Sequence, residues 1–258
     1  MPCKPNTLKQ RIDRRECLVG LWCSLTSATA VEALAGLDYD WFLLDMEHAP
    51  NGLDTVIDQL RVLDSSAVSG FVRPPGNDRV TIKRLLDVGA KNLLFPYVQN
   101  VEEAREIVRA TRYAPQGVRG VSTAGRAALY GAYPDYLGQA AKEIAIGLQI
   151  ETREALRAIP EFAALPEVDI LFFGPADLSA DMGLLGQAEH PEVRARIEAG
   201  IRQVVEAGKM AGVLAPNPAV AQGYYEAGAR FIAIGSDLQC LRGQAAALLG
   251  TSPGPGRS

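Results

Sequence analysis

The stretch Tyr39-Asp-Trp-Phe-Leu-Leu-Asp45-Met-Glu-His48-Ala-Pro-Asn51 joins an apolar run to a cluster of ionisable side chains. Residues 41–44 have the composition of a buried strand, and Asp45, Glu47 and His48 follow within four positions. Acids and an imidazole therefore collect where a strand passes into a loop. In parallel α/β proteins this is where catalytic groups are found.

A helix is expected directly after this cluster. Asn51, with Asp54 three residues later, resembles a capping box and predicts that a helix begins at Asn51. Other helix starts are predicted at Asn77-Asp78, at Asn100 with Glu103, and at Asn217-Pro218.

Short apolar runs of the same kind recur eight times along the chain and alternate with helix-period segments. They cover residues 18–24, 41–45, 68–72, 92–98, 144–150, 168–173, 211–214 and 230–234. Several are apolar almost throughout, as strands covered on both faces must be. Eight such units predict a (β/α)8 TIM barrel. The alternative, an open doubly wound sheet, lacks its usual glycine-rich phosphate motif here.

Length and charge narrow the class of protein. A chain of 258 residues fits one barrel domain, 1–250, followed by a Pro/Gly/Ser-rich tail, 251–258, expected to be disordered. The net charge of −4 and the lack of a basic run argue against nucleic acid and membrane partners. No apolar stretch predicts a membrane span or a signal peptide. Four cysteines without paired spacing indicate reduced thiols in a cytoplasmic protein.

One connection is longer than a barrel needs. Residues 99–143 separate the fourth predicted strand from the fifth. Long loops in compact domains usually form lids or contact surfaces, so we expect a lid, a surface for a neighbouring subunit, or both.

His48 is the candidate general base. The chain has two histidines, and His190 precedes Pro191 at a helix start, which indicates a structural role. A single histidine is more often structural than catalytic, but Asp45 is close enough in sequence to orient the His48 ring.

Glu151 and Asp177 are candidate metal ligands. Each follows an apolar run, and the two runs are consecutive, so both carboxylates are expected at neighbouring strand ends. Such a pair suits a hard cation such as Mg²⁺ or Mn²⁺. Both positions also open helices, where acids are favoured without any metal.

Arg73 and the turn 174–177 could bind an anionic substrate. Arg73 ends the third run, before two prolines that direct it toward the barrel mouth, where it suits a carboxylate or enolate oxygen. A salt bridge to Asp45 or Glu47 is the structural alternative. The turn Gly174-Pro-Ala-Asp177 offers backbone N–H groups at a helix start, although it is also compatible with an ordinary turn.

The lysines argue against imine chemistry. The six lysines are Lys4, Lys9, Lys83, Lys91, Lys142 and Lys209, and none lies within an apolar run. A Schiff-base aldolase needs a lysine inside the barrel or at a strand end.

Six ordered motifs resemble the class II pyruvate aldolases, the 4-hydroxy-2-oxoheptanedioate aldolase family of the aldolase/citrate lyase group. They are Asp45-Met-Glu-His48-Ala-Pro, Val72-Arg73-Pro, Leu85-Leu-Asp-Val-Gly-Ala90, Arg112-Tyr-x-Pro-x-Gly-Val-Arg-Gly120, Gln149-Ile-Glu151-Thr and Gly174-Pro-Ala-Asp-Leu-Ser-x-Asp-Met-Gly183. The resemblance runs from about Leu18 to Leu249. It implies a barrel of the phosphoenolpyruvate/pyruvate-binding type, a last helix exchanged between subunits, and a homohexamer.

The resemblance also implies roles for single residues. The metal ligands would be Glu151 and Asp177, holding Mg²⁺, Mn²⁺ or Co²⁺. The catalytic group would comprise His48, Arg73, Asp45 and an acid at Asp87 that pairs with the histidine across a subunit boundary. The substrate-binding group would comprise Gln149, the carboxylate cradle Gly174, Pro175 and Ala176, and an aldehyde pocket lined by Trp22, Arg126 and Leu214.

The expected reaction joins pyruvate to an aldehyde, or cleaves the resulting 4-hydroxy-2-oxo acid. Met46 and Ser122-Thr123 depart from the family pattern, so the aldehyde stays open between a semialdehyde and a hydroxyaldehyde. Two alternatives are an acyl-CoA lyase on the same barrel and a non-catalytic barrel that binds a 2-oxo acid. The lyase needs a basic patch, for which Arg119, Arg126 and Arg153 are the candidates.

Overall fold

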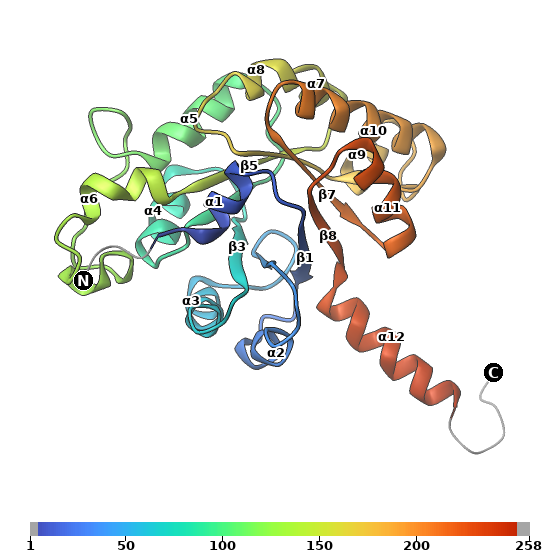
Figure 1. Cartoon of the computed structure of the whole chain (residues 1–258), viewed down its shortest axis with the longest axis horizontal. Coiled ribbons are helices and arrows are strands. Elements are labelled where there is room, and N and C mark those ends of the chain that lie inside the picture. The colour runs from blue at the N-terminus through green and yellow to red at the C-terminus, as the bar shows by residue number, and fades with distance from the viewer. Residues whose placement is uncertain (1–4, 252–258) are drawn as a thin grey trace.

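Eight parallel strands close into a barrel in the computed structural model, which describes residues 5–251 (Figure 1). The strands are β1 (Leu18–Cys23), β2 (Trp41–Asp45), β3 (Ser69–Arg73), β4 (Asn92–Phe95), β5 (Ala145–Ile150), β6 (Ile170–Phe173), β7 (Met210–Ala215) and β8 (Phe231–Ser236). Each pairs with the next along the chain, and β8 pairs with β1. The predicted (β/α)8 barrel is confirmed.

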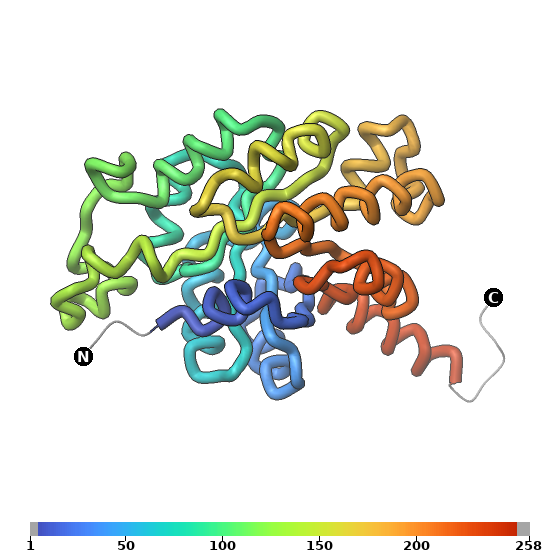
Figure 2. Tube along the Cα trace, turned by 45° about the horizontal axis from the view of Figure 1, so that its top comes forward, coloured from blue at the N-terminus to red at the C-terminus, as the bar shows by residue number. Residues whose placement is uncertain are grey.

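Helices follow the strands around the outside of the barrel (Figure 2). They are α1 (Thr7–Asp13), α2 (Ala28–Leu34), α3 (Leu53–Leu63), α4 (Arg79–Asp87), α5 (Val101–Thr111), α6 (Tyr136–Gln139), α7 (Arg153–Arg157), α8 (Ile159–Ala163), α9 (Pro175–Asp181), α10 (Pro191–Glu206), α11 (Pro218–Ala227) and α12 (Asp237–Gly250), with 3-10 turns η1 (Arg126–Gly131) and η2 (Ala140–Glu143). The predicted caps Asp78, Asn100 and Asn217 are confirmed.

The predicted helix start at Asn51 is wrong. Helix α3 begins at Leu53 with Gly52 as its N-cap, and Thr55 Oγ1 accepts the Gly52 N–H at 2.9 Å. Asn51 is drawn instead toward the strand end, where its Nδ2 donates to the Asp45 carbonyl at 2.7 Å. Its side-chain oxygen accepts from Gln59 Nε2 at 2.8 Å. Asn51 thus fixes the loop after β2 rather than the helix.

Large aromatic side chains fill the inside of the barrel. Trp41 and Phe231 stack with ring centroids 4.0 Å apart, and Phe71 and Phe172 pack against them. Helix α1 closes the N-terminal end of the barrel and buries Leu8 and Ile12 against this cluster. The space left for a ligand therefore lies at the carboxyl ends of the strands.

The long fourth connection holds one ordinary barrel helix, α5, and an additional segment, 112–143. Arg119 anchors this segment by donating to Asp87 Oδ1 at 2.8 Å and to the Tyr136 hydroxyl at 3.0 Å. Val121 and Tyr130 are exposed at its surface. The segment therefore has the solvent-facing apolar side chains expected of a contact surface.

Helix α12 points away from the barrel instead of covering it (Figures 1 and 2). Its one buried residue is Asp237, whose carboxylate accepts the backbone N–H groups of Ser24 at 2.9 Å and Leu25 at 3.1 Å. The rest of the helix is exposed. No helix in the described range has the length and apolarity to cross a bilayer. The tail predicted to be disordered, 251–258, lies outside the described residues except for Thr251.

Candidate active site

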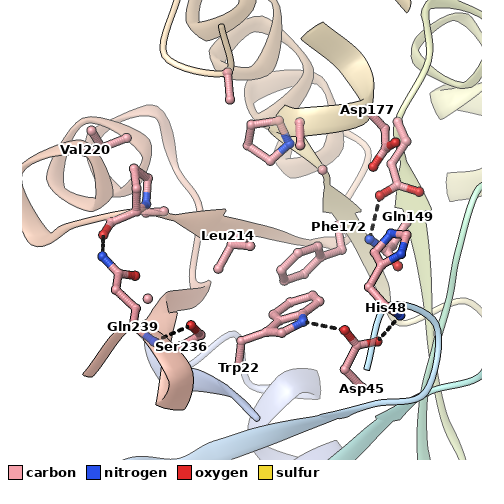
Figure 3. Close-up of a pocket in the computed structure, with 18 of the residues that line it drawn as sticks. Trp22, Asp45, His48, Gln149, Phe172, Asp177, Leu214, Val220, Ser236 and Gln239 are labelled. Atoms are coloured by element: carbon pink, nitrogen blue, oxygen red, sulfur yellow. Dashed lines mark hydrogen bonds between the residues drawn. The ribbon is translucent and has the colours of Figure 1, made fainter. Parts of the chain in front are cut away.

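A cavity of about 590 Å³ opens at the carboxyl ends of the strands (Figure 3). Most of the residues predicted for the site line it. They are Trp22, Asp45, His48, Arg73, Gln149, Glu151, Gly174, Pro175, Ala176, Asp177 and Leu214. No lysine of the described part of the chain lines the cavity.

Arg73 is clamped by two acids. It donates from Nε to Asp45 Oδ1 at 2.9 Å and from Nη2 to Asp45 Oδ2 at 2.7 Å, and its Nη1 lies 2.7 Å from Glu47 Oε2. Burial works against the Asp45 charge, but the hydrogen bonds and charge of Arg73 outweigh it and hold the Asp45 pKa below its usual value. The guanidinium also lies over the Trp22 ring, 4.8 Å from its centroid. Arg73 is therefore fixed in both position and plane.

The predicted contact between Asp45 and the His48 ring is not formed. Asp45 Oδ1 accepts the backbone N–H of Glu47 at 3.0 Å and reaches that of His48 only at 3.4 Å, while both carboxylate oxygens bind Arg73. The carboxylate is thus used to fix the loop and the arginine. The His48 ring is 65% exposed at the cavity mouth, with Nε2 3.8 Å from Glu47 Oε2. Glu47, not Asp45, is the acid beside the imidazole.

Glu151 is a buried carboxylate with few donors. Oε1 accepts from Gln149 Nε2 at 2.7 Å, and Oε2 accepts the Tyr97 backbone N–H at 2.9 Å. Tyr97 has a left-handed φ of 53°, which is unusual for a bulky residue. Burial first, and then the charge of Asp177, raise the pKa of Glu151 to about 8.

The donor set fits a divalent cation. Burial and the charges of Asp177 and Glu47 raise the Glu151 pKa, and the charge of Arg73 opposes them. A cation beside Glu151 would offset the charge of Asp177 and compete with the proton that burial favours on Glu151. Within residues 5–251 no group of three or more His, Cys, Asp or Glu side chains could hold a metal. Two carboxylates would therefore leave further positions to water and substrate.

The turn before α9 is built around Gly174. A Cβ at this position would overlap the Glu151 carboxylate, so only glycine allows the turn to approach the candidate ligand. Helix α9 has no side-chain cap at Gly174, which leaves the N–H groups of its first turn available to an anion. Asp177 lies in that same turn.

Asp87 and Arg126 do not line the cavity of their own chain. Asp87 is the last residue of α4 and binds Arg119. Arg126 donates to Asp64 and, at 2.7 Å, to the Val88 carbonyl. These contacts lie where α3 and α4 end, and the helices of a barrel run back from the carboxyl ends of its strands. Within one chain neither residue can therefore reach His48.

Two residues of the site were missed by the sequence analysis as functional candidates. Glu47 was considered only as a salt-bridge partner of Arg73, and the structure forms that contact, with Arg73 Nη1 2.7 Å from Glu47 Oε2. Tyr97 acts through its backbone N–H, for which the sequence holds no side-chain signal. His190 has the structural role that was predicted, because its Nδ1 accepts the Glu192 N–H at the start of α10.

Comparison with known proteins gives relatives over nearly the whole chain. The family model of the HpcH/HpaI aldolase/citrate lyase family matches residues 18–243. The 4-hydroxy-2-oxo-heptane-1,7-dioate aldolases of Escherichia coli strain SE11 and of Klebsiella pneumoniae are each 48% identical over 244 residues, which cover 94% of this chain and 93% and 92% of theirs.

Solved structures agree with this comparison. An HpcH/HpaI aldolase/citrate lyase family protein from Burkholderia cenocepacia J2315 is 40% identical, with a TM-score of 0.90 over 94% of this chain and 98% of that one. An HpcH/HpaI aldolase from Desulfitobacterium hafniense is 31% identical, with a TM-score of 0.86 over 97% and 99% of the two chains. The family match and the identity to these relatives show that the chain belongs to the HpcH/HpaI aldolase/citrate lyase family.

Proposed function

We propose that this protein is a metal-dependent aldolase that makes and cleaves 4-hydroxy-2-oxo acids, with pyruvate as the carbon nucleophile. One observation carries the proposal: the clamped guanidinium of Arg73 and the carboxylate pair Glu151 and Asp177 line the same cavity at the carboxyl ends of the strands. Such an arrangement suits a small 2-oxo acid, which has a carboxylate and a polarised carbonyl. The names of the bacterial relatives support the same reaction class.

Glu151 and Asp177 would hold the divalent cation, for which Mg²⁺, Mn²⁺ and Co²⁺ are the candidates. When bound, such a cation supplies Lewis-acid polarisation of the 2-oxo group. Gln149 keeps Glu151 in place through the 2.7 Å hydrogen bond. The Oε1 atom of Gln149 is buried without a hydrogen-bond partner, so one more oxygen is available there to a water or a substrate group.

His48 would remove a methyl proton from pyruvate. Its exposed ring at the cavity mouth can exchange that proton with solvent, and its Nε2 lies 3.8 Å from Glu47 Oε2. Arg73 would stabilise the negative charge on the enolate oxygen, as a fixed donor at a developing oxyanion does. The methylene carbon then attacks the aldehyde carbon, and the proton returns from His48 to the new alkoxide.

A second copy of the chain would complete the site. Asp87 and Arg126 carry family roles but lie beside the additional segment 112–143, which exposes Val121 and Tyr130. Packing of this segment over a neighbouring cavity would bring both residues to that neighbour. The projecting helix α12 would be exchanged between subunits of a homohexamer in the cytoplasm.

The acyl-CoA alternative lacks its basic patch. Arg119 binds Asp87, Arg126 binds Asp64, and Arg153 binds Asp181 at 2.9 Å. None of the three arginines lines the cavity. The candidates for a CoA phosphate site are therefore engaged elsewhere.

The half-reaction with pyruvate tests the proposal directly. Wild-type protein with Mn²⁺ should exchange the pyruvate methyl protons for deuterium in D2O, as followed by NMR. EDTA should stop the exchange, and added Mn²⁺, Co²⁺ or Mg²⁺ should restore it. Borohydride with pyruvate should leave the protein active, because no imine forms. Full exchange after thorough chelation would refute the metal-dependent mechanism, and no exchange under any condition would favour the non-catalytic alternative.

A further inference from the structure

A second pocket lies at the opposite end of the barrel from the candidate active site. It has a volume of about 170 Å³ and is found where β7 and β8 begin. This pocket, here called the basic pocket, is lined by three cations, Arg15, Lys209 and Arg230, and by apolar surface of Val205, Met210 and Ala211. Neither the segment 112–143 nor α12 contributes a residue to it. The surfaces assigned above to a neighbouring copy therefore do not include the basic pocket.

Two of the cations, Arg15 and Arg230, are held by backbone carbonyls. Arg15 Nη2 donates to the Gly208 carbonyl at 2.8 Å. Arg230 Nη1 donates to the carbonyls of Tyr225 at 2.9 Å and Ala229 at 2.8 Å, and its guanidinium lies over the Tyr225 ring, 4.1 Å from the centroid. Among the described residues each guanidinium thus uses one nitrogen for hydrogen bonds. Two nitrogens of each are left to bind an anion.

The third cation, Lys209, is half-buried. Its Nζ donates to two carbonyls of the loop after α8, at 2.8 and 2.7 Å. Burial lowers the Lys209 pKa, against the charges of Asp169 and Glu167, which raise it. Asp169 is itself paired with Lys9, and neither acid lines the basic pocket. The ammonium has therefore lost water without an acid beside it in the pocket, and a bound anion would supply the missing charge.

The carbonyls do not neutralise the three cations. They lie at or just after the C-terminal ends of α8, α10 and α11, and a helix C-terminus carries roughly half a negative charge. Three full positive charges exceed three such ends, so the basic pocket stays positive. No Asp or Glu among residues 5–251 lines it, although the whole chain has a net charge of −4. A positive pocket in an acidic protein attracts anions.

We propose that the basic pocket binds a small phosphate monoester, with its phosphate against the three cations and a short carbon chain against Val205, Met210 and Ala211. A tetrahedral phosphate presents oxygens in several directions at once, and guanidinium groups bind such oxygens in pairs. The volume of about 170 Å³ is below that of pockets for drug-sized ligands, so the ester has few carbons. The site is separate from the cavity of the aldol reaction, and the proposal does not depend on the proposed function.

Calorimetric titration of the full-length, EDTA-treated protein tests the site. The probes are inorganic phosphate and glycerol 3-phosphate, with the ionic strength held constant by NaCl so that general screening does not change. Both probes should bind and raise the Tm. The ester should bind about threefold or more tightly than phosphate, because its carbons bury apolar surface. Absence of binding would overturn the proposal, and an ester that binds no better than phosphate would overturn the assignment to an ester.

Variants of the two arginines locate the binding. Arg230→Gln and Arg15→Gln should each weaken the binding of both probes by about tenfold or more, because each removes a charged donor. Arg15 is exposed, so its variant should fold even if Arg230→Gln does not. Arg14→Gln, in an exposed ion pair with Glu16 outside the pocket, is the matched control and should keep the wild-type Kd. A wild-type Kd in Arg15→Gln, or an equal loss in Arg14→Gln, would overturn the proposal.

Discussion

Arg73 and Asp45 close neighbouring parallel strands at the same level of the barrel and are joined by two parallel hydrogen bonds of 2.9 and 2.7 Å. Their side chains are 6% and 2% exposed. A bidentate pair of this kind fixes the plane of the guanidinium as well as its position. The direction in which Arg73 presents its remaining N–H groups is therefore set by β2 and β3 before any substrate arrives.

Arg73→Lys should lower turnover by about 10² to 10³, because the ammonium keeps the charge but loses the planar fork. Steady-state kinetics with pyruvate and an aldehyde would measure the loss. Arg61→Lys, in an exposed ion pair with Asp58 on α3, is the matched control and should behave as wild type.

Asp45→Asn should also lower turnover, because it removes the carboxylate that fixes the plane of the Arg73 guanidinium. The effects of Asp45→Asn and Arg73→Lys should therefore not add in the double variant. A near-native rate in Arg73→Lys would show that the arginine is only a partner in a salt bridge.

His48→Ala should slow pyruvate methyl exchange by about 10² to 10⁴ and leave thermal stability unchanged. The first effect follows from the loss of a general base. The second follows from exposure, because 65% of the side chain is in solvent and its removal empties little buried space. Exchange and Tm are measured on the same samples.

The opposite outcome would also be informative. If His48→Ala melted earlier but exchanged protons normally per folded molecule, the imidazole would be structural, and the base would have to be sought elsewhere. Wild-type Tm with normal exchange would equally remove His48 from the mechanism.

Metal binding and stability should depend on pH in opposite directions, because of Glu151. Burial raises the Glu151 pKa from 4.5 to about 8, so between these values the folded protein without metal holds a proton that the unfolded chain has lost. Its free energy of unfolding should therefore fall as pH rises from about 4.5 to 8. A cation competes with that proton, so Mn²⁺ affinity should rise over the same window.

Calorimetric titration with Mn²⁺ across this pH range measures how the metal affinity changes with pH. Thermal melts with EDTA across the same range measure how the stability of the metal-free protein changes with pH. Glu151→Gln has no proton to lose at this position and should flatten both. A metal-free Tm that rises steadily through the window in wild type would contradict the buried, protonated state.

Lysines on the apolar stripe of α12 should break the assembly. Leu241 and Leu248 are seven residues apart, so they lie on one face of the helix, and both are exposed in the single chain. The variant Leu241→Lys with Leu248→Lys should sediment as a 27.6 kDa monomer, whereas wild type should be larger. Ala247→Lys, on another face, is the control. Identical sedimentation of the three proteins would exclude α12 from the interface.

The strands could be predicted from the sequence. The side-chain contacts of the residues that end the strands were harder to predict. Continuous apolar composition identified all eight strands, because both faces of a parallel barrel strand are covered. The same analysis paired Asp45 with His48, its near neighbour in sequence, and gave a salt bridge from Arg73 to Asp45 or Glu47 as a structural alternative. The structure forms the salt bridge between Asp45 and Arg73, 28 positions apart, because parallel register brings the last residues of β2 and β3 together.

Other parts of the site have no signal in one sequence. The Tyr97 backbone N–H donates to Glu151 from a residue in the left-handed conformation. Because the donor is a backbone group, the residue type at this position does not predict it. Asn51 is a residue type that often caps helices, but here its side chain donates a hydrogen bond to the Asp45 carbonyl instead. Asp87 and Arg126 have roles only through the family resemblance, and within one chain neither residue lines the cavity.

The Asp237 carboxylate binds the backbone just after β1 and so fixes the first turn of α12 at the seam where β8 meets β1. The direction of the helix is thus set as soon as the barrel closes. Under the proposed exchange, a newly folded subunit already has its helix extended, and no hinge has to open or refold. Assembly would then be a simple bimolecular encounter, with a rate that rises with protein concentration and has no unfolding barrier.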